Sequence, residues 1–124
     1  MWLDQARADY SSLEILLKAE KYDLVCFLAQ QVAEKALKAF LISRGEENIH
    51  SHSIAMLCEM CSGLDPSLSE LKKQIKNLTP YYVEARYPNA LEEIPARYFD
   101  QKDAIEAVKM ATIALESIKI NFKK

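Results

Sequence analysis

Residues 22–43, YDLVCFLAQQVAEKALKAFLIS, decide the fold of this chain. Their apolar side chains recur at three- and four-residue steps, which is the period of one face of an α-helix. That stripe consists of Val25, Ala29, Val32, Ala36, Ala39 and Phe40. Leu24 and Leu28 widen the apolar arc, and Arg44-Gly45 is a common helix stop. A helix that is apolar over so wide an arc belongs at the centre of a bundle or against a second subunit.

Four further segments carry apolar stripes with the same helical period. The stripes are Ala6, Tyr10, Leu13 and Leu17; Ile54, Leu57, Cys58 and Cys61; Leu68, Leu71, Ile75, Leu78 and Tyr82; and Ala104, Val108, Ala111, Leu115, Ile118 and Phe122. Because each segment has one apolar face, the helices must pack on one another. The sequence therefore predicts an all-α, up-and-down antiparallel bundle of four to five helices in a single domain, residues 1–124.

Polar residues and prolines mark where these helices begin and break. Ser53 is placed to cap the third helix, and Asp100 or Asp103 can start the last one. Pro80 interrupts the fourth stripe, so we expect a kink or a restart there. Residues 87–99 contain two prolines and have no period. A long irregular loop of this kind is a candidate for function.

Composition excludes several classes of protein. The 124 residues include only two glycines, which argues against an all-β fold and against a glycine-rich phosphate loop. The formal net charge of −2 provides no overall basic field, so DNA is not an expected partner. The opening residues lack the pattern of a signal peptide, and no apolar run approaches the ~20 residues of a membrane span. We therefore expect a cytoplasmic protein with no membrane segment and no cofactor.

The three cysteines raise the question of a metal. Cys58 and Cys61 form a Cys-x-x-Cys pair, and His50 and His52 precede it. Such a set resembles a zinc site. However, both cysteines fall on the apolar stripe of the third helix, where cysteine acts as a small hydrophobic residue. We expect buried free thiols in a reducing compartment and no metal.

A polar strip interrupts the central helix. Gln31, Glu34, Lys35 and Lys38 share one side at three- and four-residue spacing. A surface ion pair between Glu34 and Lys38 is the simplest interpretation. The alternative is a strip in a groove or at a dimer interface, where Lys35 and Lys38 contribute to binding a ligand.

Histidine, arginine and tyrosine side chains at helix ends form a second candidate site. His52 lies at the predicted start of the third helix, and Arg86 lies at the predicted end of the fourth, with Tyr82 and Tyr87 close in sequence. Arginine can hold phosphate and tyrosine can stack on a base, so we expect these residues to bind a phosphate-containing ligand. In the simpler interpretation His52 and Arg86 cap their own helices.

Three stretches resemble the HEPN domain family. Residues 29–39, AQQVAEKALKA, are similar to its second-helix signature. Residues 52–57, HSIAML, are similar to its histidine followed by an apolar helix, and residues 82–89, YVEARYPN, to its Tyr-x-x-x-Arg-Tyr-Pro element. The resemblance spans nearly the whole chain.

The resemblance implies a helical homodimer that binds a nucleotide or RNA. It also implies a partner, a minimal nucleotidyltransferase, with which the protein forms a toxin–antitoxin-type module. Many family members are ribonucleases with an Arg, four to six residues and a His near the start of the last long helix. Here no histidine follows Arg86 or Arg97. Arg44 and His50 have the spacing, but they lie across a helix end and a loop.

Three hypotheses follow. The first is a binding protein: a HEPN-type dimer that takes a nucleotide or RNA and pairs with a nucleotidyltransferase. The second is a metal-independent RNA endonuclease that uses His52 and Arg86. The third is a purely structural dimerisation module. The missing Arg–His motif favours the first over the second.

Overall fold

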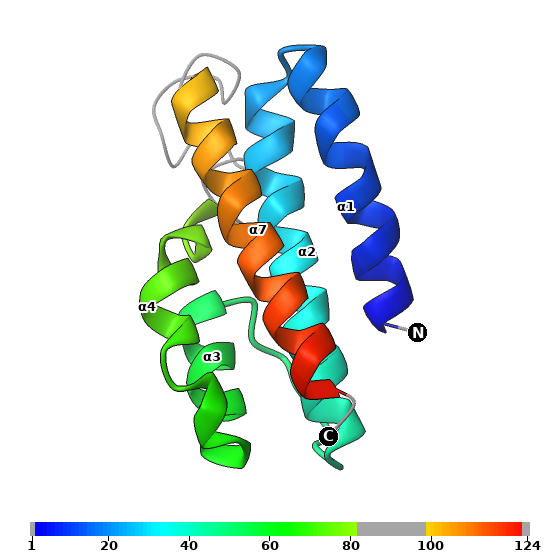
Figure 1. Ribbon diagram of the computed structural model, residues 1–124, viewed down its shortest axis with the longest axis vertical. Coiled ribbons are helices and arrows are strands. Elements are labelled where there is room, and N and C mark those ends of the chain that lie inside the picture. Colours follow the sequence, from blue (N-terminus) through cyan, green and yellow to red (C-terminus); the bar gives the residue numbers. More distant parts are fainter. Residues whose placement is uncertain (1, 82–98, 123–124) are drawn as a thin grey trace.

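The computed structural model describes residues 2–81 and 99–122 (Figure 1). These residues form five α-helices: α1 (Trp2–Lys18), α2 (Tyr22–Ser43), α3 (Ile54–Leu64), α4 (Leu71–Ile75) and α7 (Gln101–Phe122). Short 3₁₀ helices at Pro66–Leu68 and Lys76–Leu78 flank α4. Every regular element within the described residues is a helix, as the stripes predict. None of the described helices combines the length and the apolar character needed to cross a membrane.

The long helices α1, α2 and α7 lie side by side, and α3 and α4 cover one flank of α2 and α7 (Figure 1). Helix α1 runs antiparallel to α2, and α3 runs antiparallel to α4. Helix α7 runs in the same direction as α2, so that Arg44 after α2 reaches Asn121 near the end of α7. The chain thus alternates in direction along the bundle. Residues 44–53 run back from the end of α2 toward the start of α3 without forming a helix.

Helix α2 is the centre of the core. It packs most extensively on α7 and α1 and then on α3. Small residues on α2 and α7 allow the helices to approach closely: Ala29, Ala33, Ala36, Ala104, Ala107, Ala111 and Ala114 are all fully buried. Packing within one chain therefore covers most of the wide apolar arc of α2, but Leu24 and Ile42 stay 47% and 46% exposed.

Local sequence explains where the helices begin and end. After α2, Gly45 adopts a φ of 89°, its N–H donates to Ile42 O, and the N–H of Glu46 donates to Leu41 O. This is a Schellman ending, which favours glycine at the position with positive φ. Before α7, the Asp103 N–H donates to Asp100 Oδ1 and the Asp100 N–H to Asp103 Oδ2. The first of these bonds holds the pKa of Asp100 below its usual value.

The fourth apolar segment differs from the predicted helix. Its described stripe is buried as expected, at Leu68, Leu71, Ile75 and Leu78. The backbone, however, is a 3₁₀ turn, a short α-helix and a second 3₁₀ turn. Side chains three residues apart share a face in a 3₁₀ helix too, so the spacing alone could not separate the two. A turn at Thr79 and Pro80 follows the second 3₁₀ helix, at the position where Pro80 predicts a break. Thr79 Oγ1 accepts from the Ala55 N–H at the start of α3.

Candidate functional site

His52 meets the polar residues of α2 because the chain doubles back after that helix. Helix α2 ends at Ser43, and residues 44–53 return along it before α3 begins at Ile54. Ser53 caps α3 as predicted, because its Oγ accepts from the Met56 N–H. His52, one residue earlier, is left to face α2. Its carbonyl accepts from Gln30 Nε2 at 3.1 Å.

Glu34 lies at the centre of a polar cluster formed by Gln30, Glu34, Lys38 and His52, here called the Glu34 cluster. Its Oε1 accepts from Gln30 Nε2 and its Oε2 from Lys38 Nζ, each at 3.0 Å. His52 Nδ1 lies 3.1 and 3.2 Å from the two carboxylate oxygens. The Glu34 side chain is 6% exposed, whereas that of His52 is 49% exposed. The cluster therefore joins a buried carboxylate to an imidazole that reaches solvent.

These contacts determine which nitrogen of His52 carries a proton. The amide nitrogen of Gln30 and the ammonium of Lys38 can only donate, so the two oxygens of Glu34 are arranged as in an ionised carboxylate. An ionised carboxylate can only accept, so Nδ1 of His52 donates to it. In the neutral imidazole the lone pair then lies on Nε2. The same geometry orients the histidine in many acid–base sites.

Gln30 holds the cluster together, although the predicted polar strip contains Gln31 and not Gln30. Gln30 is fully buried, and its Nε2 donates both to Glu34 and to the carbonyl of His52. Its Oε1 accepts from Gln31 Nε2 at 2.7 Å. Gln30 therefore fixes the backbone of the returning segment against α2. The signal in the sequence was its four-residue spacing from Glu34, which matches the spacing from Glu34 to Lys38.

The two lysines of the strip are paired within the chain. Lys38 is 8% exposed at its side chain, binds Glu34, and has its Nζ 5.9 Å from the centroid of the Trp2 ring. Lys35 donates to Asp9 on α1. The two lysines thus lie between α1 and α2 rather than on open surface, and a carboxylate of the same chain balances each ammonium. The expected ligand-binding roles of Lys35 and Lys38 stay predictions.

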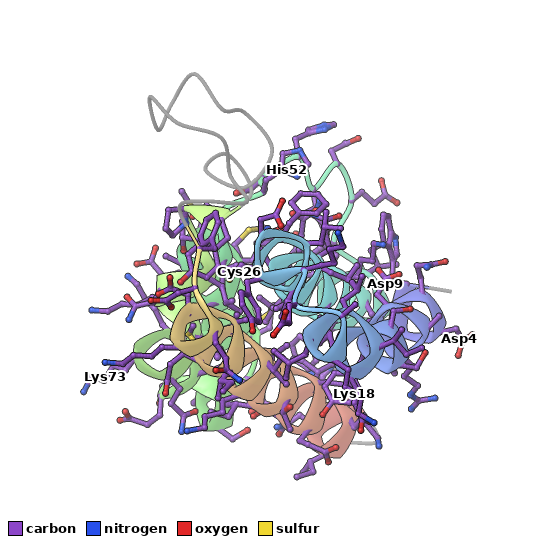
Figure 2. All side chains as sticks on the ribbon, turned by 90° about the horizontal axis from the view of Figure 1, so that it is seen from above. Asp4, Asp9, Lys18, Cys26, His52 and Lys73 are labelled. Carbon is purple, nitrogen blue, oxygen red and sulfur yellow. The ribbon has the colours of Figure 1, made fainter. Side chains whose placement is uncertain are left out.

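Three other predicted ligand-binding residues fall within 82–98, outside the described residues: Tyr82, Arg86 and Tyr87. The residues on either side of this range are close together, because Tyr81 and Phe99 stack edge to face with ring centroids 5.4 Å apart. Thr79 contacts the N–H of Ala55 at the start of α3. Through these two contacts both flanks of residues 82–98 lie near the start of α3. His52, labelled in Figure 2, lies two residues before that helix begins.

The alternative pair with Arg–His spacing, Arg44 and His50, has a different environment. The Arg44 guanidinium lies 4.5 Å from the centroid of the Phe40 ring and donates to the carbonyl of Asn121. Arg44 therefore supports the packing of α2 against α7. His50 is exposed in the returning segment. Neither residue belongs to the Glu34 cluster.

Cys58 and Cys61 are buried on α3, and Cys26 is buried on α2, all as free thiols. The thiol of Cys61 donates to the carbonyl of Leu37. Burial raises the pKa of each cysteine to about 12, which keeps the thiols protonated. Within the described residues no group of three or more His, Cys, Asp or Glu side chains could hold a metal ion.

The sequence matches the HEPN domain family over residues 1–121. This chain belongs to the HEPN domain family. A curated relative from Methanocaldococcus jannaschii, named "Putative toxin MJ1304", is 29% identical, with 96% of this chain and 84% of the relative covered. Crystal structures of TT1696 from Thermus thermophilus and of ST0689, described as an archaeal HEPN homologue, each superpose with a TM-score of 0.78. They are 33% and 31% identical, and cover 95% and 97% of this chain and 93% of each neighbour.

The HEPN assignment confirms the resemblance drawn from the three sequence stretches, and the helical fold agrees with it. Two of those stretches form the Glu34 cluster, since the second-helix signature supplies Gln30, Glu34 and Lys38, and the next supplies His52. The third stretch, residues 82–89, lies outside the described part of the chain.

Proposed function

We propose that this HEPN domain protein binds a nucleotide or RNA at the Glu34 cluster and works as one component of a toxin–antitoxin-type module. The observation that carries the proposal is the pair of contacts from Glu34 to Nδ1 of His52, which hold a half-exposed imidazole in one orientation. The name of the Methanocaldococcus relative, "Putative toxin MJ1304", supports the module. Its second component is a minimal nucleotidyltransferase.

Phosphate and ribose groups suit the chemistry of this cluster. An imidazole with a fixed orientation can donate to or accept from a ribose hydroxyl or a phosphate oxygen near neutral pH. Arg86 supplies the cation for the phosphate, because guanidinium groups bind phosphate through two parallel hydrogen bonds. Tyr82 or Tyr87 stacks on a base. His52 is the described member of this set, and the flanks of residues 82–98 lie at its end of the bundle.

RNA cleavage is the second candidate, because the Glu34 contact favours the tautomer of His52 that accepts a proton at Nε2. In this reaction Nε2 takes the proton of a ribose 2′-hydroxyl. The 2′ oxygen bonds to the adjacent phosphorus, and the bond from phosphorus to the 5′ oxygen breaks. The departing 5′ oxygen takes a proton from water, and the hydroxide that remains takes the proton back from Nε2. The products are a cyclic phosphate and a 5′-hydroxyl, and the imidazole is neutral again.

The test is a titration of a mononucleotide and of a short single-stranded RNA against the wild type and the variants His52→Ala and Arg86→Ala. We expect each variant to bind about tenfold more weakly, which is the worth of about one hydrogen bond to a charged group. His50→Ala is the matched control, because it removes the neighbouring exposed histidine. Unchanged binding by folded His52→Ala and Arg86→Ala proteins rules out the site. Cleavage by the wild type that is lost in His52→Ala makes the ribonuclease the better description.

We also predict that the protein is a homodimer in solution, as the family resemblance implies. A C₂ pair is the commonest oligomer and needs only one self-complementary surface. Light scattering at micromolar concentration should give about twice the monomer mass of 14.2 kDa. A mass that stays at the monomer value across the concentration range contradicts this prediction.

A further inference from the structure

Trp2 is a large aromatic side chain that the fold leaves partly uncovered. It is the only tryptophan in the sequence, and 41% of its surface is exposed. Its ring lies 5.9 Å from Lys38 Nζ, which holds it against the side of α2. Lys38 already has a carboxylate partner in Glu34. The contact with Trp2 is therefore not needed to neutralise the lysine.

A continuous row of contacts joins Trp2 to the candidate site. The ring contacts Lys38, Lys38 binds Glu34 at 3.0 Å, and Glu34 binds His52 at 3.1 Å. The Trp2 ring and the imidazole of His52 are thus at most about 14 Å apart, which is roughly four stacked nucleotides at 3.4 Å each. Both ends of the row are exposed, and the charged pair between them is buried.

We infer that Trp2 is a base-stacking residue, which holds one base of a single-stranded RNA while another part of the strand lies at His52. This inference rests on the proposed function. An aromatic ring accepts any base on its face, and such stacking is worth ~1–3 kcal/mol per base by alanine substitution. Between the two ends, Lys38 and Glu34 neutralise each other beneath the surface, so a polyanionic strand that passes over this pair meets no unpaired carboxylate from it.

The surroundings of Trp2 favour a strand of RNA over the apolar face of a second protein. The side chains that follow Trp2 in this row of contacts are all polar, namely Lys38, Glu34 and His52. Ile42, one turn beyond Lys38 on α2, is also exposed, at 46%. Trp2 and Ile42 by themselves make a far smaller apolar patch than a stable protein interface needs. Ile42 also provides a control, since a protein partner on this face would need it as well.

Two measurements test the inference. First, the intrinsic fluorescence of the wild type is followed during titration with a short single-stranded RNA and with AMP. Because Trp2 is the only tryptophan, we expect saturable quenching by stacking. Second, the anisotropy of a labelled RNA is measured with Trp2→Ala, Trp2→Phe and Ile42→Ala. We expect binding to weaken about tenfold or more in Trp2→Ala and to stay within a few-fold of the wild type in the other two.

The outcomes separate the inference from the function on which it rests. If the wild type binds no RNA or AMP, both fail. If the wild type binds and loses affinity in His52→Ala but not in Trp2→Ala, the stacking role alone is wrong. If Trp2→Ala and Ile42→Ala both lower the mass seen by light scattering, the surface is an interface with a second copy, and the inference is overturned. Circular dichroism of each variant shows that it is folded.

Discussion

Glu34→Ala is expected to lower the free energy of unfolding by about 3–5 kcal/mol, because it removes one partner of a buried ion pair. The change leaves the ammonium of Lys38, only 8% exposed at its side chain, without its carboxylate. It also removes one of the two acceptors of Gln30 Nε2 and leaves the carbonyl of His52 as the other. Urea unfolding followed by circular dichroism measures the loss. A free energy within 1 kcal/mol of the wild type would show that Glu34 is not a buried, ionised group.

A double variant separates the structural role of Glu34 from its functional one. Replacing a buried ion pair by apolar residues of similar volume is often neutral or stabilising, so Glu34→Leu with Lys38→Met should recover most of the stability. The double variant still lacks the carboxylate that accepts from Nδ1 of His52. We therefore expect a stable protein that binds RNA as weakly as His52→Ala does. A double variant with wild-type affinity would show that His52 needs no orientation from Glu34.

Most of the fold was predictable because it depends on local periodicity. The central helix was predicted at 22–43, and α2 spans Tyr22–Ser43. The Arg44-Gly45 stop and the Ser53 cap were predictable for the same reason, since each acts within a few residues of its own helix end. The broken fourth helix was not predictable from spacing, because 3₁₀ and α segments bury the same stripe.

The candidate site was only partly predictable because it depends on a segment with no period. Glu34 and Lys38 stood out by their spacing, and His52 by its residue type. Their meeting depends on the path of residues 44–53, which return along α2 with no helical pattern to indicate their direction. Gln30 looked like one more polar residue on α2. Only the returning backbone, whose His52 carbonyl accepts from it, makes Gln30 part of the site.

The three thiols should react with iodoacetamide about 1,000-fold more slowly in the folded protein than in urea at about pH 8. The thiolate is the reactive form, and each unit of pKa changes its fraction tenfold. Burial raises the pKa of Cys26, Cys58 and Cys61 from 9.0 to about 12, so the folded state holds almost no thiolate. Mass spectrometry of peptides after timed labelling gives the rate at each cysteine.

The same shifts predict the direction of alkaline destabilisation. A folded-state pKa above the unfolded value means that folding retains protons, so this contribution to stability is complete below about pH 9 and is lost between about 9 and 12. Labelling should therefore accelerate over this range as the core opens. Zinc on Cys58 and Cys61 would protect them too, but a chelator would then expose them. We expect no effect of EDTA on the rates. Fast labelling of Cys58 and Cys61 only after EDTA would replace the interpretation as buried thiols with a metal site.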